Sequence, residues 1–209
     1  MKLMEHFQLF AQPFWVNILV LIPLALFFIW RSGGIQISRR KLLVAAIFAT
    51  AFGFVEAVVV VYLRAAAGLL PAYTGTASQF QQTAQIPNPP VPTVSHFSQT
   101  LLTVEMVREG ATMVMLVSIA FLTVSRRREQ WAMFLWTFAV WDISYYAGLW
   151  ATIHWPTSLK DLDILFLLPV PWLAQVWYPL LVSCLTIITV GLSRRESGPV
   201  SVTEAQSTG

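Results

Sequence analysis

Long apolar runs separated by short clusters of charge constrain this chain more than any other feature of its sequence. The runs cover residues 14–30, 42–63, 101–124, 131–151 and 172–192. Each is close to the ~20 residues that cross the ~30 Å hydrocarbon core of a bilayer as a helix. Only 11% of the residues are charged, against roughly 25% in an ordinary soluble domain. The sequence therefore predicts an all-α integral membrane protein, with residues 1–192 forming one bundle of about five transmembrane helices.

The basic residues predict how this bundle is oriented. Most of them flank the same ends of the runs, namely Arg31, Arg39, Arg40, Lys41, Arg126, Arg127, Arg128, Arg194 and Arg195. Lysine and arginine beside a span favour the cytoplasmic side. We therefore expect the N-terminus outside, the C-terminus in the cytoplasm, and a multi-pass protein of the plasma (inner) membrane. These charges form no basic face interleaved with exposed aromatic residues, so nucleic acid is not a predicted partner.

Three segments lie outside the predicted spans. Residues 65–100 are rich in Gln, Thr, Ser and Pro and are expected to form an extracytoplasmic loop with extended polyproline character. Residues 164–170 are expected to form an interfacial or half-inserted segment, because prolines interrupt the apolar run there, and the fifth span is expected to be kinked near Pro179. Residues 193–209 are expected to be a disordered cytoplasmic tail.

A ridge of small side chains runs along the second predicted span. Ala45, Ala49, Gly53 and Ala57 recur at every fourth position, which lets a neighbouring backbone approach closely. The simplest interpretation is ordinary helix packing. The alternative is a docking surface for a membrane-protein partner or for a second copy of the chain.

Ionisable residues gather near the outer ends of three predicted helices. At ~100° per residue, Glu105, Arg108 and Glu109 share one helical face. At 1.5 Å per residue, Glu56, Glu109 and Asp142 lie about 11, 12 and 14 Å below the outer ends of their spans. Burying a charge at such a depth costs roughly 3 kcal/mol, so intramembrane charges mark function by default.

This arrangement predicts a buried acidic site that opens toward the non-cytoplasmic side. Hard oxygen ligands for a divalent metal would come from Glu56, Glu109 and Asp142. Acid and base roles would fall to Glu105, Glu109 and His154, and substrate contacts to Arg108, Tyr145 and Tyr146. The competing interpretation is a structural knot, in which Arg108 neutralises the Glu105/Glu109 pair and fixes the register of the helices.

Standard catalytic motifs do not narrow this choice. The sequence has no Glu-x-x-His pair of a di-iron bundle, no HExxH, no G-x-S-x-G and no phosphate-cradling glycine loop. Three classes of function remain. The first is a metal- or proton-dependent membrane enzyme acting on a lipid or lipid-linked substrate. The others are a proton or cation transport component and a non-catalytic subunit of a membrane complex. Five spans without an internal repeat weigh against a self-contained transporter.

Overall fold

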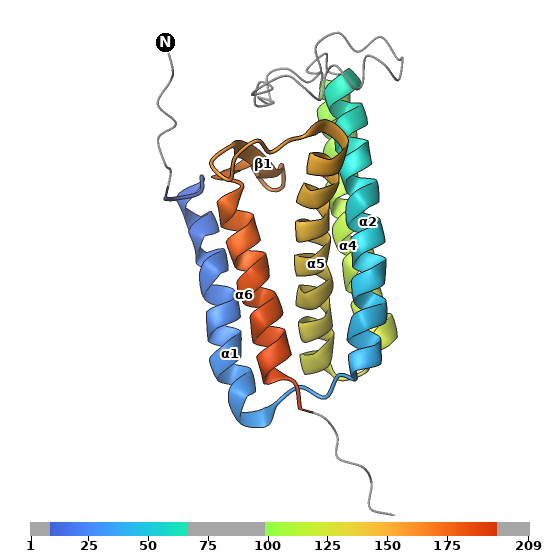
Figure 1. Ribbon diagram of the computed structural model, residues 1–209, viewed down its shortest axis with the longest axis vertical. Helices are drawn as coiled ribbons and strands as arrows, with labels where there is room; N and C mark the ends of the chain where they lie inside the picture. The colour runs from blue at the N-terminus through green and yellow to red at the C-terminus, as the bar shows by residue number, and fades with distance from the viewer. Residues whose placement is uncertain (1–8, 67–98, 196–209) are drawn as a thin grey trace, which may run out of the picture.

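The computed structural model describes residues 9–66 and 99–195. The predicted loop over residues 65–100 falls almost wholly outside these ranges, and so does most of the predicted tail. Within them the chain forms η1 (Phe14–Val20), α1 (Leu21–Gly33), α2 (Arg39–Ala66), α4 (Gln99–Thr123), α5 (Arg127–Ile153), β1 (Leu162–Phe166), β2 (Trp172–Gln175) and α6 (Trp177–Ser193) (Figure 1). The fold is a bundle of helices with one short hairpin between α5 and α6.

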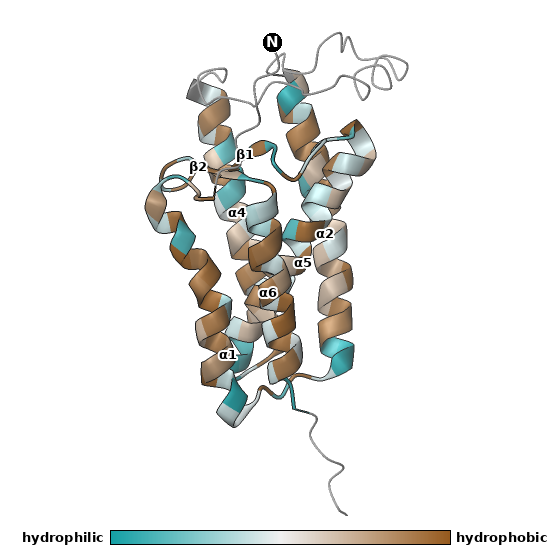
Figure 2. Ribbon diagram, turned by 60° about the vertical axis from the view of Figure 1, so that its left-hand side comes forward, coloured by the Kyte–Doolittle hydropathy of each residue, from teal (hydrophilic) through white to brown (hydrophobic). Residues whose placement is uncertain are grey.

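In the part of the chain that the structure describes, three helical segments are long and apolar enough to cross a membrane. They are Phe14–Gly33, in which α1 continues η1, together with Arg39–Ala65 and Thr100–Thr123. Large apolar side chains such as Phe28, Ile47 and Leu122 are exposed along these segments. Figure 2 shows that hydrophobic residues predominate along α1 and also along α6. Exposing so many large apolar side chains to water is unfavourable. Their exposure along these segments is therefore typical of a membrane protein.

The centre of the bundle is α5, which packs against α2, α4 and α6, whereas α1 packs on α6. The exposed large hydrophobic residues of α5 are Trp131 and Trp150, which lie near its two ends. Its middle carries Asp142, Tyr145 and Tyr146. With these polar groups α5 is less apolar than the other long helices, but its neighbours cover most of them.

The small-residue ridge of α2 is the surface on which α5 packs. A Cβ atom added at Gly53 would lie 2.5 Å from the backbone oxygen of Trp141, and Gly148 of α5 meets the Cβ of Ala57 in the same way. Ala49 and Ala57 are fully buried in the single chain. The ridge thus serves packing within the chain, and we do not propose it as a docking surface.

Residues 164–170, which were expected to form an interfacial or half-inserted segment, belong to a β-hairpin. Its strands β1 and β2 pair antiparallel, with Leu162 opposite Gln175 and Asp163 opposite Ala174. Two prolines at the tip prevent helix, and the branched and aromatic residues around them favour extended chain. The hairpin is a short sheet in a fold that is otherwise helical, as predicted.

The last helix begins later than predicted, at Trp177 rather than at residue 172. Pro179 therefore lies in the first turn of α6. It interrupts no helical hydrogen bond there, because the N–H groups of a first turn have no partner within the helix. Pro179 therefore gives no reason for the kink that was expected near it.

The opposite end of the bundle is closed by the connection between α1 and α2. Ile35 and Ile37 are buried there. The N–H of Ile35 donates to the carbonyl of Ser193 at 2.9 Å, and the N–H of Arg195 donates to the carbonyl of Ile35 at 3.0 Å. The first residues of the predicted tail are therefore ordered by backbone hydrogen bonds.

Candidate functional site

A partly enclosed pocket lies at the hairpin end of the bundle. Its volume is about 130 Å³, enough for several water molecules or a small polar group. The ionisable and tyrosine residues in its lining are Glu56, Arg64, Glu105, Arg108, Glu109, Asp142, Tyr145, Tyr146, Asp163 and Tyr178. The rest of the lining is largely apolar and aromatic. Every predicted site residue except His154 therefore reaches one cavity.

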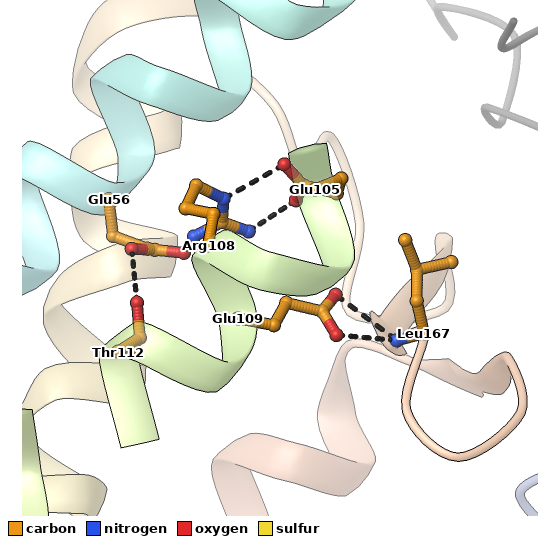
Figure 3. A network of polar contacts seen from close by, with 6 residues as sticks. All are labelled: Glu56, Glu105, Arg108, Glu109, Thr112 and Leu167. Atoms are coloured by element: carbon orange, nitrogen blue, oxygen red, sulfur yellow. Dashed lines mark hydrogen bonds and ion pairs between the residues drawn. The ribbon is translucent and has the colours of Figure 1, made fainter. Parts of the chain in front are cut away.

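On one side of the pocket, Arg108 contacts two carboxylates (Figure 3). Its Nε donates to Glu105 Oε2 at 2.8 Å, and its guanidinium forms a second bond to Glu105 and an ion pair with Glu56 of α2. The hydroxyl of Thr112 also donates to Glu56, at 3.3 Å. Helical spacing brings Glu105, Arg108 and Thr112 to this side of α4.

Glu109 turns away from this cluster and holds the hairpin. Its two carboxylate oxygens accept the backbone N–H of Leu167, at 2.8 and 3.1 Å (Figure 3). Leu167 directly follows β1, so this contact ties the hairpin to α4. The prediction that Arg108 neutralises the Glu105/Glu109 pair is therefore wrong in one member, since Glu56 takes the place of Glu109.

On the other side of the pocket, Asp142 of α5 accepts a hydrogen bond from the hydroxyl of Ser183 of α6 at 2.8 Å. Both residues are buried. A buried carboxylate needs such a donor, because the charge would otherwise lose its hydration without compensation. This bond joins α5 to α6 at the level of the pocket.

Sequence reasoning missed a second charged pair in the lining of the pocket. Arg64 lies at the end of α2, and its Nη2 atom is 3.8 Å from Asp163 Oδ1 of β1. The Cζ atom of Arg64 lies over the ring of Trp155, 4.1 Å from the ring centroid. The hydroxyl of Tyr146 donates to Asp163 at 2.9 Å. Burial raises the pKa of the Asp163 carboxyl, whereas Arg64 and Tyr146 act in the opposite direction.

Arg64 directly follows an apolar run and Asp163 directly precedes one, so in the sequence each charge only marks the end of an apolar segment. A usable signal existed in the sequence: charges of opposite sign lie at the outer ends of two neighbouring segments. The two charges pair because the hairpin carries Asp163 to Arg64, and the sequence did not predict this hairpin.

The predicted metal ligands Glu56, Glu109 and Asp142 do not lie together as one ligand set in the part of the chain that the structure describes. Over residues 9–66 and 99–195, no three His, Cys, Asp or Glu side chains converge as metal ligands. Each predicted ligand has a separate protein partner: Arg108 for Glu56, the hairpin backbone for Glu109 and Ser183 for Asp142. The geometry thus disfavours a metal centre built from these three residues.

His154 also falls outside the site. It ends α5 in a left-handed conformation, with φ 52°, and its side chain is exposed. Its ring lies 6.1 Å from that of Trp150 in an edge arrangement. The catalytic role predicted for His154 therefore finds no geometric support.

Comparison with protein-family models, with curated proteins and with solved structures found no match. The chemistry of the pocket must therefore be argued from its own residues.

Proposed function

We propose that this protein is a five-span membrane protein that binds a lipid or lipid-linked molecule in the hairpin-end pocket and transfers a proton there. The observation that carries the proposal is the pocket itself, which combines an apolar and aromatic wall with a cluster of buried carboxylates. Such a lining suits an amphipathic ligand, because apolar walls bury its chain while a few polar groups orient its head.

The proposed topology has the N-terminus and the hairpin outside and the C-terminus in the cytoplasm. It counts α5 and α6 as spans in addition to the three apolar segments. The 27 residues of α5 are long enough to cross, and the 17 residues of α6 extend over about 26 Å at 1.5 Å per residue. The exposed apolar tip of the hairpin, at Leu168 and Val170, supports a position at the outer interface.

Glu109 is the group that we assign to proton transfer. Glu56 and Glu105 are both engaged by Arg108, whereas the hydrogen-bond donor to Glu109 is a neutral backbone N–H. A carboxylate held by a neutral donor in an apolar pocket exchanges a proton more readily than one that is locked to a guanidinium. This proposal concerns proton-dependent chemistry and requires no metal.

The transport alternative is less well supported. Among the described residues, the acidic side chains of the helical bundle cluster at the hairpin end, apart from Glu129 in the first turn of α5. A proton or cation path would need polar groups across the whole membrane. Between the two ends lies the buried apolar cluster that contains Ala49 and Leu116.

Native mass spectrometry of the detergent-purified protein tests ligand binding. We expect about one copurified lipid per chain in wild type, and loss of that lipid in Val182→Trp, which fills the pocket. The matched control is Glu129→Gln, a buried acidic residue at the other end of α5, which should retain the lipid. Absence of lipid from well-folded wild type, or its retention in Val182→Trp, would contradict the proposal.

Labelling of single cysteines with a membrane-impermeant maleimide tests the topology. In a Cys184→Ser background, Lys160→Cys in the loop after α5 should react in intact cells. Ser32→Cys at the end of α1 should react only after permeabilisation. The reverse pattern would invert the proposed orientation.

A further inference from the structure

We propose that the pocket selects a zwitterionic phospholipid headgroup, with its ammonium beside the uncompensated carboxylates and its oxygen atoms beside buried N–H donors. This inference rests on the proposed lipid binding and names the class of ligand. Three features of the pocket carry it: an excess of negative charge, a row of aromatic rings, and buried donors without acceptors.

The charge balance disfavours an anionic headgroup. Five carboxylates line the pocket, from Glu56, Glu105, Glu109, Asp142 and Asp163, but only two guanidinium groups do, from Arg64 and Arg108. Arg108 is engaged by two carboxylates, and Arg64 lies beside Asp163. Binding of an anionic head by Arg108 would therefore require Arg108 to give up its contacts with both carboxylates.

Glu109 and Asp142 are the carboxylates that a ligand cation would compensate. Their hydrogen-bond donors are the N–H of Leu167 and the hydroxyl of Ser183, which are both neutral. Neither residue forms an ion pair within the described part of the chain. A buried carboxylate without a cation either takes up a proton or attracts a positive group. An ammonium group in the pocket would favour the ionised form of both carboxylates, so that Glu109 acts as the proton acceptor once the ligand is bound.

Aromatic rings form a continuous wall between α5 and the hairpin. The centroid of Phe166 lies 6.3 Å from Phe138, 6.5 Å from Trp141 and 5.4 Å from Trp172. Tyr145 stacks on Trp141 with centroids 6.2 Å apart. All five rings line the pocket. Cations, including quaternary ammonium groups, are attracted to aromatic faces, most strongly to tryptophan.

Three buried N–H donors in this lining have no acceptor among the described residues: Trp141 Nε1, Trp172 Nε1 and Arg64 Nε. The side chains of Trp141 and Arg64 are more than nine-tenths buried, with 6% and 4% exposure. Buried donors nearly always have a partner, and leaving one unpaired costs about 1–3 kcal/mol. Acceptor oxygens on a bound molecule, which a phosphodiester or an ester group supplies, would satisfy these donors.

A zwitterionic headgroup satisfies both requirements, since it carries an ammonium and phosphate oxygens a few bonds apart. An anionic glycerol headgroup offers the oxygens without the cation. A simple alkylammonium offers the cation without the oxygens. Comparison of these three ligand classes therefore isolates each part of the recognition.

The test measures binding of short-chain ligands to delipidated protein by native mass spectrometry. The probes are dihexanoyl phosphocholine and phosphoethanolamine, dihexanoyl phosphoglycerol, and dodecyltrimethylammonium. We expect the zwitterionic lipids to bind about tenfold more tightly than phosphoglycerol, which corresponds to about 1.4 kcal/mol. The alkylammonium should bind more weakly than the zwitterionic lipids. Equal or tighter binding of phosphoglycerol would overturn the inference.

Variants then separate the two halves of the headgroup. Glu109→Gln should lower the preference for phosphocholine over phosphoglycerol about tenfold, even where the loosened hairpin weakens the binding of both lipids. Asp142→Asn serves if Glu109→Gln does not fold. Trp141→Phe keeps an aromatic ring but removes the N–H, and should weaken both lipids, phosphocholine more because a phenyl ring attracts cations less strongly than an indole. Glu129→Gln is the control for a charge change outside the pocket.

The outcomes distinguish this inference from the function on which it rests. If lipids bind without preference between headgroups, or if both carboxylate variants retain the wild-type preference, the headgroup assignment fails while lipid binding stands. If no lipid binds to the folded protein, the proposed function itself fails.

Discussion

The guanidinium of Arg108 on α4 forms an ion pair with the carboxylate of Glu56 on α2. Both helices pack mainly on α5 rather than on each other, so this pair links them directly at the level of the pocket. Glu105, one turn away on α4, completes the contact with a second carboxylate. The three charges form a unit that couples the position of α4 to that of α2.

Arg108→Ala should strongly destabilise the protein, because it leaves Glu56 and Glu105 buried without a cation. Removing one partner of a buried pair costs about 3–5 kcal/mol. Since Arg108 retains 20% side-chain exposure, the lower end of that range is expected. The measurement is the thermal unfolding midpoint in detergent. Unchanged stability in Arg108→Ala would show that the ion pair contributes little.

A second substitution identifies which carboxylate depends on Arg108. In the Arg108→Ala background, Glu56→Gln should recover part of the lost stability, because a neutral amide tolerates burial better than an unpaired charge. Glu109→Gln should recover less, since Glu109 bonds to the hairpin backbone. Equal rescue by the two changes would count against the observed pairing.

Gly53→Ala should separate α2 from α5. The added Cβ would lie 2.5 Å from the backbone oxygen of Trp141, so a backbone must move, which costs about 1–3 kcal/mol. Gly191→Ala on α6 is the matched control, because nothing lies within 4 Å of its added Cβ. Thermal unfolding should show a lower midpoint for Gly53→Ala alone. A comparable loss in the control would instead point to a general effect of the substitution.

Glu109→Gln should loosen the hairpin. The carboxylate accepts the N–H of Leu167 through both oxygens, and a neutral amide oxygen is a weaker acceptor. Hydrogen–deuterium exchange of the peptide that contains Leu167 should become faster, whereas peptides from α1 should keep the wild-type rate. If protection at the hairpin does not change, β1 and β2 hold it without help from α4.

Tyr146→Phe should destabilise the protein by about 1–3 kcal/mol. It removes the hydroxyl that donates to Asp163 at 2.9 Å and leaves that buried carboxylate one donor short. Adding Asp163→Asn should make the loss from Tyr146→Phe smaller, because an amide is cheaper to bury than a carboxylate. A chemical-denaturation series over the four combinations measures this coupling; strict additivity would mean that the hydrogen bond is energetically silent.

The sequence alone determined that the chain is mostly helical and that several of the pocket's ionisable residues lie at one level. Long apolar runs must bury their backbone hydrogen bonds within helices, and helical spacing places Glu105, Arg108 and Glu109 near one another on α4. The helical rise of 1.5 Å per residue also placed Glu56 and Asp142 at nearly the same depth as Glu109. Both inferences depend on local geometry, which one chain segment sets for itself.

Only the tertiary structure decided which partner each charge takes. Glu109 bonds to Leu167 because a hairpin folds over the bundle there, and Arg64 meets Asp163 for the same reason. The apolar segment before α6 did not reveal this hairpin, since short apolar runs do not distinguish strand from buried helix. Ion pairing depends on ångström distances between separate segments, and a sequence specifies these only through the packing of the whole chain.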